Sequence, residues 1–278
     1  KKKFEKIQLT VNAHYCDEFN KIKPDIIVVY NEQLLLPSTL ELFKKSDVKI
    51  IFILGDNPLA LAPTNIYNLS ILFFADLIIC PDSSWKLQLE KMGIENIIFD
   101  YMFNINDSVS LEYNREEELL FIGRTYRGAW GYKRCLFLNH FNNLNIDIHG
   151  TGAHWNFWLD HFPKLKDKTI IHKNRLPLTK FNNLLLSYKI HPVDANPGIS
   201  SGIHLRIFEC LNAGILPLAE HTNDFDVVFR DTPLPTIKDF HECENMAVEY
   251  SKNNKERIKI VRDAREHLVE NYSPIKVM

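Results

Sequence analysis

Short apolar runs alternate with amphipathic stretches through the first hundred residues of the chain. Runs of strand length, separated by longer stretches with helical periodicity, predict a parallel sheet covered by helices. The predicted strands span residues 7–11, 25–30, 48–54, 77–80 and 96–99. The predicted helices span 37–45, 64–73 and 83–92. We interpret this part of the chain as one doubly wound domain.

A polar segment, residues 104–117, has no sustained period and is the best candidate for a linker. A second alternation follows it. Strands are predicted at 118–122, 145–149, 169–172, 188–193 and 215–219, and helices at 132–141 and 178–187, with solvent-facing helices from 239 to 270. The sequence therefore predicts an α/β protein with two Rossmann-like domains, residues 1–104 and 105–278, that face a central cleft.

Length and charge narrow the class of protein. The 278 residues, 45% of them hydrophobic, suffice for two cores. A net charge of −2 gives no indication of a nucleic-acid partner or of electrostatic binding to a membrane. The longest apolar run, residues 71–81, is interrupted by Asp76 and is too short to span a bilayer. Peripheral membrane association and oligomeric state stay open.

Five cysteines are present, and none has the paired spacing of metal ligands. Their odd number favours reduced thiols in the cytosol. No apolar segment of signal-peptide type follows Lys1, Lys2 and Lys3. We therefore expect a cytoplasmic protein that uses no metal ion and no cofactor.

Residues 196–209 are the most informative stretch, because small residues there precede an amphipathic helix that ends at Ala213 and Gly214. Ser200, Ser201 and Gly202 suit a helix N-terminus, whose N–H groups attract phosphate. Arg206 and Glu209 follow at a spacing that puts them on one helix face. A guanidinium there suits a phosphate and a carboxylate suits a ribose diol, so the pattern predicts a nucleotide-diphosphate site. The alternative to a phosphate site is a helix N-terminus without a ligand, followed by a helix whose apolar residues pack in the core.

Small or polar residues stand where several predicted strands end. These are Gly123, Gly150, Asn196 and Gly202. Open α/β sheets bind ligands outside the carboxyl ends of their strands, so these positions predict the edge of a ligand site.

The segment that contains these residues resembles part of a known protein family. "NPGISSGIHLRIFECLNAGILPL", residues 196–218, is similar to the C-terminal signature of GT-B-fold glycosyltransferases, in particular the CgeB-like, spore-maturation-type branch. The signature positions are Gly202, Arg206, Phe208, Glu209, Ala213 and Gly214. Less specific similarity includes "FIGR" at 121–124, "IHGTGAHW" at 148–155, and, in the first domain, "KPDIIVV", "GDNP" and "ADLIICPDSSWKLQLEKMG".

The resemblance implies that the C-terminal domain holds a sugar-nucleotide donor and the N-terminal domain an acceptor. It further implies that Glu209 binds the donor ribose and that the amides around Ser201 and Gly202 bind the diphosphate. One departure concerns the Glu-x7-Glu pattern of many retaining members. The position eight before Glu209 is Ser201, so the first glutamate is absent.

Glycosyl transfer needs cations for the leaving diphosphate and, with inversion, a base for the acceptor hydroxyl. Arg124, Lys173 and Arg206 are the candidate cations; the alternative for each is a solvated surface charge. Asp56 is the preferred base, because it follows an apolar strand of the first domain and would act from across the cleft; alternatively it forms an Asx turn. Other candidate bases are His14, Glu32 and His154.

Aromatic residues at 155, 157 and 158 suit a sugar or base pocket, although packing in a core is the favoured interpretation.

Together with these residues, the resemblance implies a metal-independent glycosyltransferase that moves a sugar from a nucleotide-sugar donor to a glycan or surface-polysaccharide acceptor. A nucleotide-sugar epimerase of the same fold and a non-catalytic binding or coat protein are the alternatives.

Overall fold

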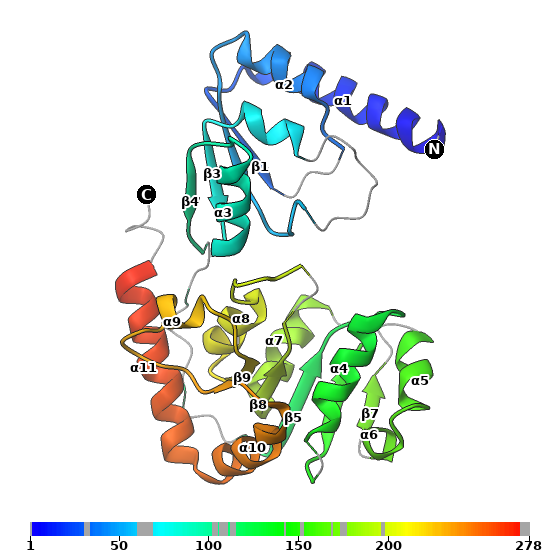
Figure 1. The fold of residues 1–278 in the computed structure, drawn as a ribbon, viewed down its shortest axis with the longest axis vertical. Helices are drawn as coiled ribbons and strands as arrows, with labels where there is room; N and C mark the ends of the chain where they lie inside the picture. Colours follow the sequence, from blue (N-terminus) through cyan, green and yellow to red (C-terminus); the bar gives the residue numbers. More distant parts are fainter. Residues whose placement is uncertain are drawn as a thin grey trace. The chain divides into compact units, whose positions relative to one another are not determined.

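The computed structural model describes residues 2–30, 34–59, 69–101, 105, 111, 115–141, 143–150, 153–167, 169–172, 177–195 and 198–272. The chain forms two compact units, shown in Figure 1. Unit 1 contains residues 1–102 together with the short segment 198–202, and unit 2 contains residues 103–197 and 203–278. The segment 198–202 thus packs with unit 1 although the chain on both sides of it belongs to unit 2.

Unit 1 is built on a four-stranded parallel sheet of β1 (Ile26–Tyr30), β2 (Lys49–Ile53), β3 (Leu77–Cys80) and β4 (Ile97–Phe99), which lie side by side in sequence order. The connections are α2 (Pro37–Lys44), η1 (Ser70–Phe74) and α3 (Ser83–Lys91). Right-handed crossovers that all advance in one direction place these connections on one face of the sheet. The opposite face of β1 is exposed, with Ile26, Val28 and Tyr30 each more than half accessible.

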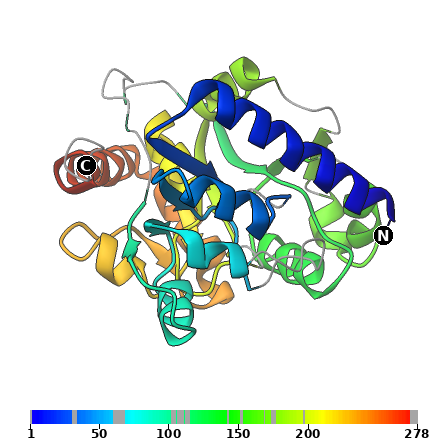
Figure 2. The same cartoon turned by 90° about the horizontal axis from the view of Figure 1, so that it is seen from above.

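The predicted strand at 7–11 is wrong. These residues lie within helix α1 (Lys2–Ile22), which packs against α2, as Figures 1 and 2 show. Asn12 is buried there and joins the two helices: its Oδ1 accepts from the Leu36 amide at 2.9 Å and from the Thr39 hydroxyl at 2.7 Å. Part of the predicted helix 64–73 lies outside the described residues, and its end is the 3-10 helix η1.

Unit 2 is built on a six-stranded parallel sheet in the order β10-β9-β8-β5-β6-β7. The strands are β5 (Glu117–Ile122), β6 (Ile146–His149), β7 (Thr169–His172), β8 (Tyr188–Val193), β9 (Leu216–Glu220) and β10 (Thr236–Ile237). The helices are α4 (Ala129–Asn139), α5 (Ala153–Leu159), α6 (Pro163–Asp167), α7 (Leu178–Ser187), α8 (Leu205–Ala213), α9 (Phe225–Val228), η2 (Phe240–Glu242), α10 (Cys243–Lys252) and α11 (Asn254–Tyr272).

The helices of unit 2 form two groups. Helices α4, α5 and α6 contact one another, while α8 contacts both α7 and α11. The strand order reverses between β5 and β8, so right-handed crossovers place these groups on opposite faces of the sheet. Between β5, β8 and the second group lies a core that includes Leu120, Leu185, Tyr188, Cys210 and Ile215.

Arg115 fixes the ends of two of these helices. Its guanidinium is buried and donates to the carbonyls of Leu185 and Tyr188 at 2.7 and 2.9 Å and to that of Ala213 at 2.7 Å. Carbonyls at helix C-termini have no partner within the helix, and a buried cation satisfies them well. The residue lies in the segment predicted as a linker, so the end of that segment is part of unit 2.

Candidate functional site

A pocket of about 360 Å³ opens in unit 2 at the carboxyl ends of β5 and β8. Strand order reverses between these two strands, and open α/β sheets bind ligands at such a reversal. The pocket is lined by Phe121, Ile122, Gly123, Arg124, Tyr126, Arg134, His191, Pro192, Val193, Asp194, His204 and Arg206. Three arginines and two histidines make it a polar pocket suited to an anionic ligand.

The side chain of His191, on β8, lines this pocket and accepts a hydrogen bond from β5. The amide of Ile122 donates to Nε2 of His191 at 3.2 Å, and Nδ1 of the same ring lies 2.7 Å from the Pro192 carbonyl oxygen. An accepting Nε2 requires a neutral ring with its proton on Nδ1. Burial, with Arg206 adding to it, lowers the pKa of His191 to about 3.

Arg134 and Asp194 form a buried ion pair in the same pocket. Nε of Arg134 lies 3.0 and 2.8 Å from the two carboxylate oxygens of Asp194, and Nη1 donates to the carbonyl of Arg124. The guanidinium also lies over the rings of Phe121 and Tyr126, 5.4 and 5.3 Å from their centroids. This arginine is therefore engaged by the protein, and it holds the loop between β5 and α4 in place.

Arg206 and Glu209 lie on α8, as the spacing predicts, and they contact each other. Nη1 of Arg206 is 2.5 Å from Oε2 of Glu209. The guanidinium lies 5.0 Å from the centroid of Phe181 on α7. Arg206 lines the pocket with a side chain 19% exposed, whereas that of Glu209 is 49% exposed. The pair thus has one member in the pocket and one that is accessible to solvent.

The N-cap of α8 is His204, not one of the small residues predicted for that role. Its Nδ1 accepts from the Arg206 amide at 2.9 Å. Desolvation of the ring, followed by the charges of Arg206 and Arg134, lowers the pKa of His204 to about 4. A neutral imidazole is required for this cap, because the accepting nitrogen must carry no proton.

The amides predicted to face a phosphate bind a carboxylate of the protein. The N–H groups of Ser200, Ser201 and Gly202 donate to Oδ2 of Asp82 at 2.8, 2.9 and 2.8 Å. Asp82 is also the N-cap of α3. No local pattern in the sequence relates Asp82 to a segment more than a hundred residues away.

The remaining predicted pocket residues differ in their environments. Arg124 is exposed and lines the pocket. Gly123 also lines the pocket, and its amide donates to the His149 carbonyl at 3.0 Å. At Gly150 a side chain would meet Nε1 of Trp155 at 2.3 Å, so packing explains this glycine. Lys173 and Asn196 lie outside the described residues.

The candidate bases differ in exposure. Asp56 is exposed in the turn after β2, and the neighbouring Asn57 accepts at Oδ1 from the Leu59 amide at 2.9 Å, as in an Asx turn. His14 is exposed on α1. His154 accepts from Nε of Arg127 at 3.2 Å. Glu32 lies outside the described residues.

The aromatic cluster contributes mainly to a core. Trp155 and Trp158 are buried, whereas Phe157 is half exposed. None of the five cysteines forms a disulfide. Burial raises the pKa of Cys135 to about 12 and also raises the pKa of Cys210, so neither thiol is suited to nucleophilic chemistry.

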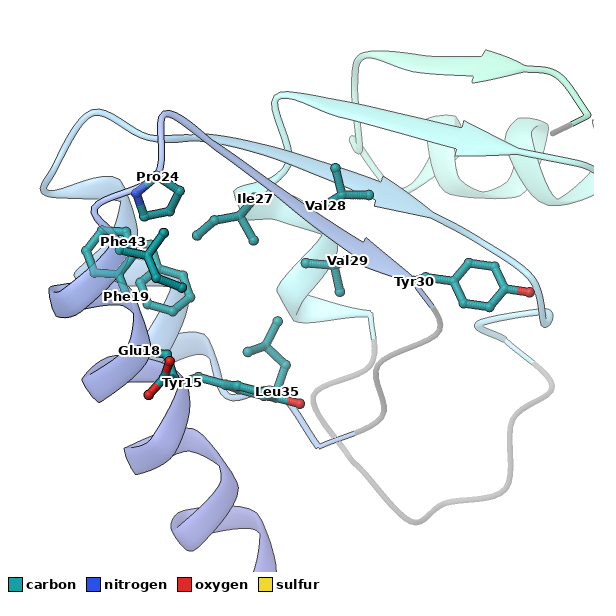
Figure 3. A pocket seen from close by; sticks show the side chains of 11 residues that line it. Tyr15, Glu18, Phe19, Pro24, Ile27, Val28, Val29, Tyr30, Leu35 and Phe43 are labelled. Carbon is teal, nitrogen blue, oxygen red and sulfur yellow. The ribbon is translucent and has the colours of Figure 1, made fainter. Parts of the chain in front are cut away.

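A second cavity, of about 330 Å³, lies in unit 1 between α1 and the edge strand β1. Figure 3 shows Phe19, Phe43 and Leu35 around it, with Glu18 at its margin. Its lining is mainly apolar, and it holds no pair of groups suited to acid–base chemistry.

Two features are absent from the described part of the chain, a metal-binding cluster and a membrane-spanning helix. No cluster of three or more His, Cys, Asp or Glu residues could hold a metal ion there. The helices described there are too short or too polar to cross a bilayer.

Comparison with solved structures shows the fold. TarM superposes with a TM-score of 0.64 at 12% identity, over 91% of this chain and 53% of TarM. The lipopolysaccharide outer core galactosyltransferase WaaB gives 0.65 at 13% identity, over 96% of this chain and 76% of that one. A trehalose-6-phosphate protein from E. coli bound with UDP-2-fluoro glucose gives 0.64 at 13% identity, over 95% and 74%. The chain thus spans about half of TarM and about three quarters of the other two.

These structures identify the fold as the GT-B fold of glycosyltransferases. No curated protein sequence matches the chain. The family described as glycosyl transferase-like matches residues 133–278, which is more than half of the chain and includes Arg134, the strands from β6 onward, and α8. The chain therefore belongs to the glycosyl transferase-like family.

Proposed function

We propose that the chain transfers a glycosyl group from a nucleotide-sugar donor to a glycan or surface-polysaccharide acceptor, without a metal ion. The observation that carries the proposal is the pocket at the β5/β8 reversal, with Arg206 in its wall and Glu209 one turn further along α8. Membership of the family supports glycosyl transfer, and the E. coli neighbour bound with UDP-2-fluoro glucose supports a nucleotide-sugar donor.

The donor diphosphate is assigned to the arginines of the pocket that remain accessible, Arg206 and Arg124. As the bond between the anomeric carbon and the diphosphate breaks, negative charge develops on the departing oxygen, and a fixed guanidinium stabilises it. Contact with Phe181 and Glu209 limits the conformations of Arg206 before the donor binds. Arg134 stays paired with Asp194, and both side chains line the same pocket.

The donor ribose is assigned to Glu209. Its exposed carboxylate can accept hydrogen bonds from the two ribose hydroxyls while its second oxygen keeps Arg206. We assign Gly123, which lines the pocket, to the strand-end edge of the same site, together with Gly150, whose lack of a side chain also permits the packing of Trp155. Lys173 and Asn196 are assigned to further contacts with the donor.

The acceptor chemistry is assigned to Asp56. In an inverting reaction its carboxylate takes the proton of the acceptor hydroxyl while that oxygen bonds to the anomeric carbon and the diphosphate leaves. Ser201, which stands where many retaining enzymes have a glutamate, is buried, and its hydroxyl is 2.6 Å from that of Ser84. A surface-polysaccharide acceptor is supported by the similarity to WaaB. We further propose that the chain belongs to the CgeB-like branch of the family and is located in the cytoplasm.

The test is a thermal-shift screen of the protein against UDP, GDP, CMP and dTDP, followed by assays with the matching sugar nucleotides. A ligand that binds only the native state raises the midpoint of unfolding, so one nucleotide should raise it more than the others. Transfer of the sugar, or its slow release to water, supports a transferase. Conversion of the donor to an epimer supports the epimerase, and no response to any nucleotide supports a binding protein without catalysis.

A further inference from the structure

A single carboxylate holds the segment 198–202. Oδ2 of Asp82 accepts from three consecutive amides, those of Ser200, Ser201 and Gly202, at 2.8 to 2.9 Å. Oδ1 accepts from the amides of Ser84 and Trp85 at 2.9 and 3.1 Å. Asp82 has no exposed surface. Five backbone N–H groups thus converge on one buried side chain, which is the arrangement that stabilises an anion in a protein interior.

Other contacts close the space around this carboxylate. The hydroxyls of Ser84 and Ser201 are 2.6 Å apart, and Nε1 of Trp85 donates to the Gly198 carbonyl at 3.0 Å. A side chain at Gly202 would lie 2.6 Å from the Pro81 carbonyl oxygen and 3.0 Å from Cβ of Asp82. Only glycine permits this approach. The segment and the start of α3 are therefore in direct contact, without room for a phosphate between them.

Replacement of the Asp82 carboxylate by a donor phosphate, as the acceptor for these three amides, would be unfavourable. Oδ2 would lose three N–H donors at once, and a buried carboxylate without such donors carries a large desolvation penalty. The hydroxyl and indole hydrogen bonds would also break. These losses indicate that the three amides stay bound to the Asp82 carboxylate when the donor binds.

Gly202 is followed directly by Ile203 and by His204, the N-cap of α8, and α8 carries Arg206 and Glu209. We infer that Asp82 is a positioning residue for donor binding: it sets the conformation of the segment that leads into α8, and the three amides bind Asp82 in place of the donor diphosphate. This inference rests on the proposed function for the role of α8. The donor phosphates are then left to the side chains of the unit 2 pocket.

The test measures the affinity for UDP by calorimetry in the wild-type protein, Asp82→Ala and Asn12→Ala. Asn12 is the matched control, because it is a buried hydrogen-bonding residue of unit 1 that contacts α2 instead of the segment 198–202. Both substitutions lower the melting temperature. Only Asp82→Ala should weaken UDP binding, by about tenfold or more, and 50 to 100 mM formate, a small carboxylate, should restore part of it.

Hydrogen exchange at residues 200–202 provides a readout that needs no nucleotide. These amides should be protected in the wild-type protein, exchange rapidly in Asp82→Ala, and regain protection with formate. If Asp82→Ala does not fold, Asp82→Asn, which keeps one acceptor oxygen without the charge, serves in its place and should show a smaller loss of protection and affinity.

Three results would overturn the inference. Tighter UDP binding by Asp82→Ala would mean that Asp82 and the diphosphate compete for the same amides. Unchanged UDP binding and unchanged protection would mean that the carboxylate does not hold the segment. A wild-type protein that binds no nucleoside diphosphate would overturn the proposed function and with it the donor role of Asp82, whereas hydrogen exchange would still decide whether the carboxylate holds residues 200–202.

Discussion

Nε of Arg134 lies between the two carboxylate oxygens of Asp194, 3.0 Å from Oδ1 and 2.8 Å from Oδ2, and both side chains are almost fully buried. Burial raises the pKa of Asp194, and the neighbouring guanidinium opposes that rise. A charge in such a place is stable only with its partner. The pair therefore links α4 to the end of β8, and both of its side chains line the pocket.

Replacing one partner should destabilise unit 2 strongly. We expect Asp194→Asn to lower the free energy of unfolding by about 3–5 kcal/mol, because Arg134 keeps its charge without a counter-charge. Arg134→Met combined with Asp194→Asn should be more stable than Asp194→Asn alone. Urea unfolding checks both, with Lys166→Ala at an exposed ion pair as the control. A double variant no more stable than the single one would show that charge is not the cause.

The neutral histidines of the pocket make stability depend on pH. The pKa of His191 is about 3 in the folded protein, against about 6.5 in an unfolded chain. Between these values the unfolded state binds the extra proton, so stability is fully present above pH 6.5 and falls as pH falls. One such group contributes a slope of about 1.4 kcal/mol per pH unit.

His191→Gln tests this contribution, because glutamine can accept the Ile122 hydrogen bond and does not titrate. Between pH 6 and 4.5 the free energy of unfolding should fall less steeply for His191→Gln than for the wild-type protein. The difference in slope should be about 1.4 kcal/mol per pH unit, the contribution of one proton. His14→Gln, at an exposed position on α1, is the control. Equal slopes for wild type and His191→Gln would mean that His191 does not govern the acid sensitivity.

Much of the fold could be predicted because its signals are local. The apolar run at 188–193 and the amphipathic stretch at 178–187 have the bounds of β8 and α7. The error at 7–11 has a physical cause: a short run of alternating residues fits a strand, while the longer spacing of Gln8, Asn12, Tyr15 and Phe19 fits the helix that packs on α2.

The site could be predicted only in part. The spacing of Arg206 and Glu209 is local, and the structure has them in contact on α8. The partners of Asp82 and Arg134 are 118 and 60 residues away in the chain. Such pairs depend on how strands and helices pack, and no periodicity reveals them. The cap at His204 could not be predicted from the sequence, because histidine is not among the preferred N-cap residues.

Glu209 should contribute to nucleotide binding through the ribose. We expect Glu209→Ala to weaken UDP binding by about ten- to a hundredfold, the range for hydrogen bonds to a charged acceptor. The matched ligand is 2′,3′-dideoxy-UDP, which lacks the diol and should bind wild type and variant alike. The same loss for both ligands would assign the effect to Arg206, the partner of Glu209, instead of to the ribose.

Arg206 should contribute through the diphosphate. Arg206→Lys keeps the charge but loses the planar group that lies over Phe181 and contacts Glu209. We expect weaker binding of UDP, little change for uridine, and a lower rate of transfer, with the exposed Arg262→Lys as the control. A variant that retains wild-type turnover and UDP affinity would place phosphate recognition elsewhere in the protein.

The proposed role of Asp56 as the general base predicts a loss of transfer without a loss of donor binding. Asp56→Asn keeps the shape of the side chain and removes its basicity, and the turn should persist because Asn57 makes the Asx hydrogen bond. Transfer should fall by about 10²–10⁴-fold, the usual range for a general base, while donor affinity stays nearly constant. Asn57→Ala is the control: it should lower the melting temperature, because the buried Asn57 makes that bond. Near-normal transfer by Asp56→Asn would remove the assignment and leave Glu32, His14 or a retaining mechanism without an enzyme base.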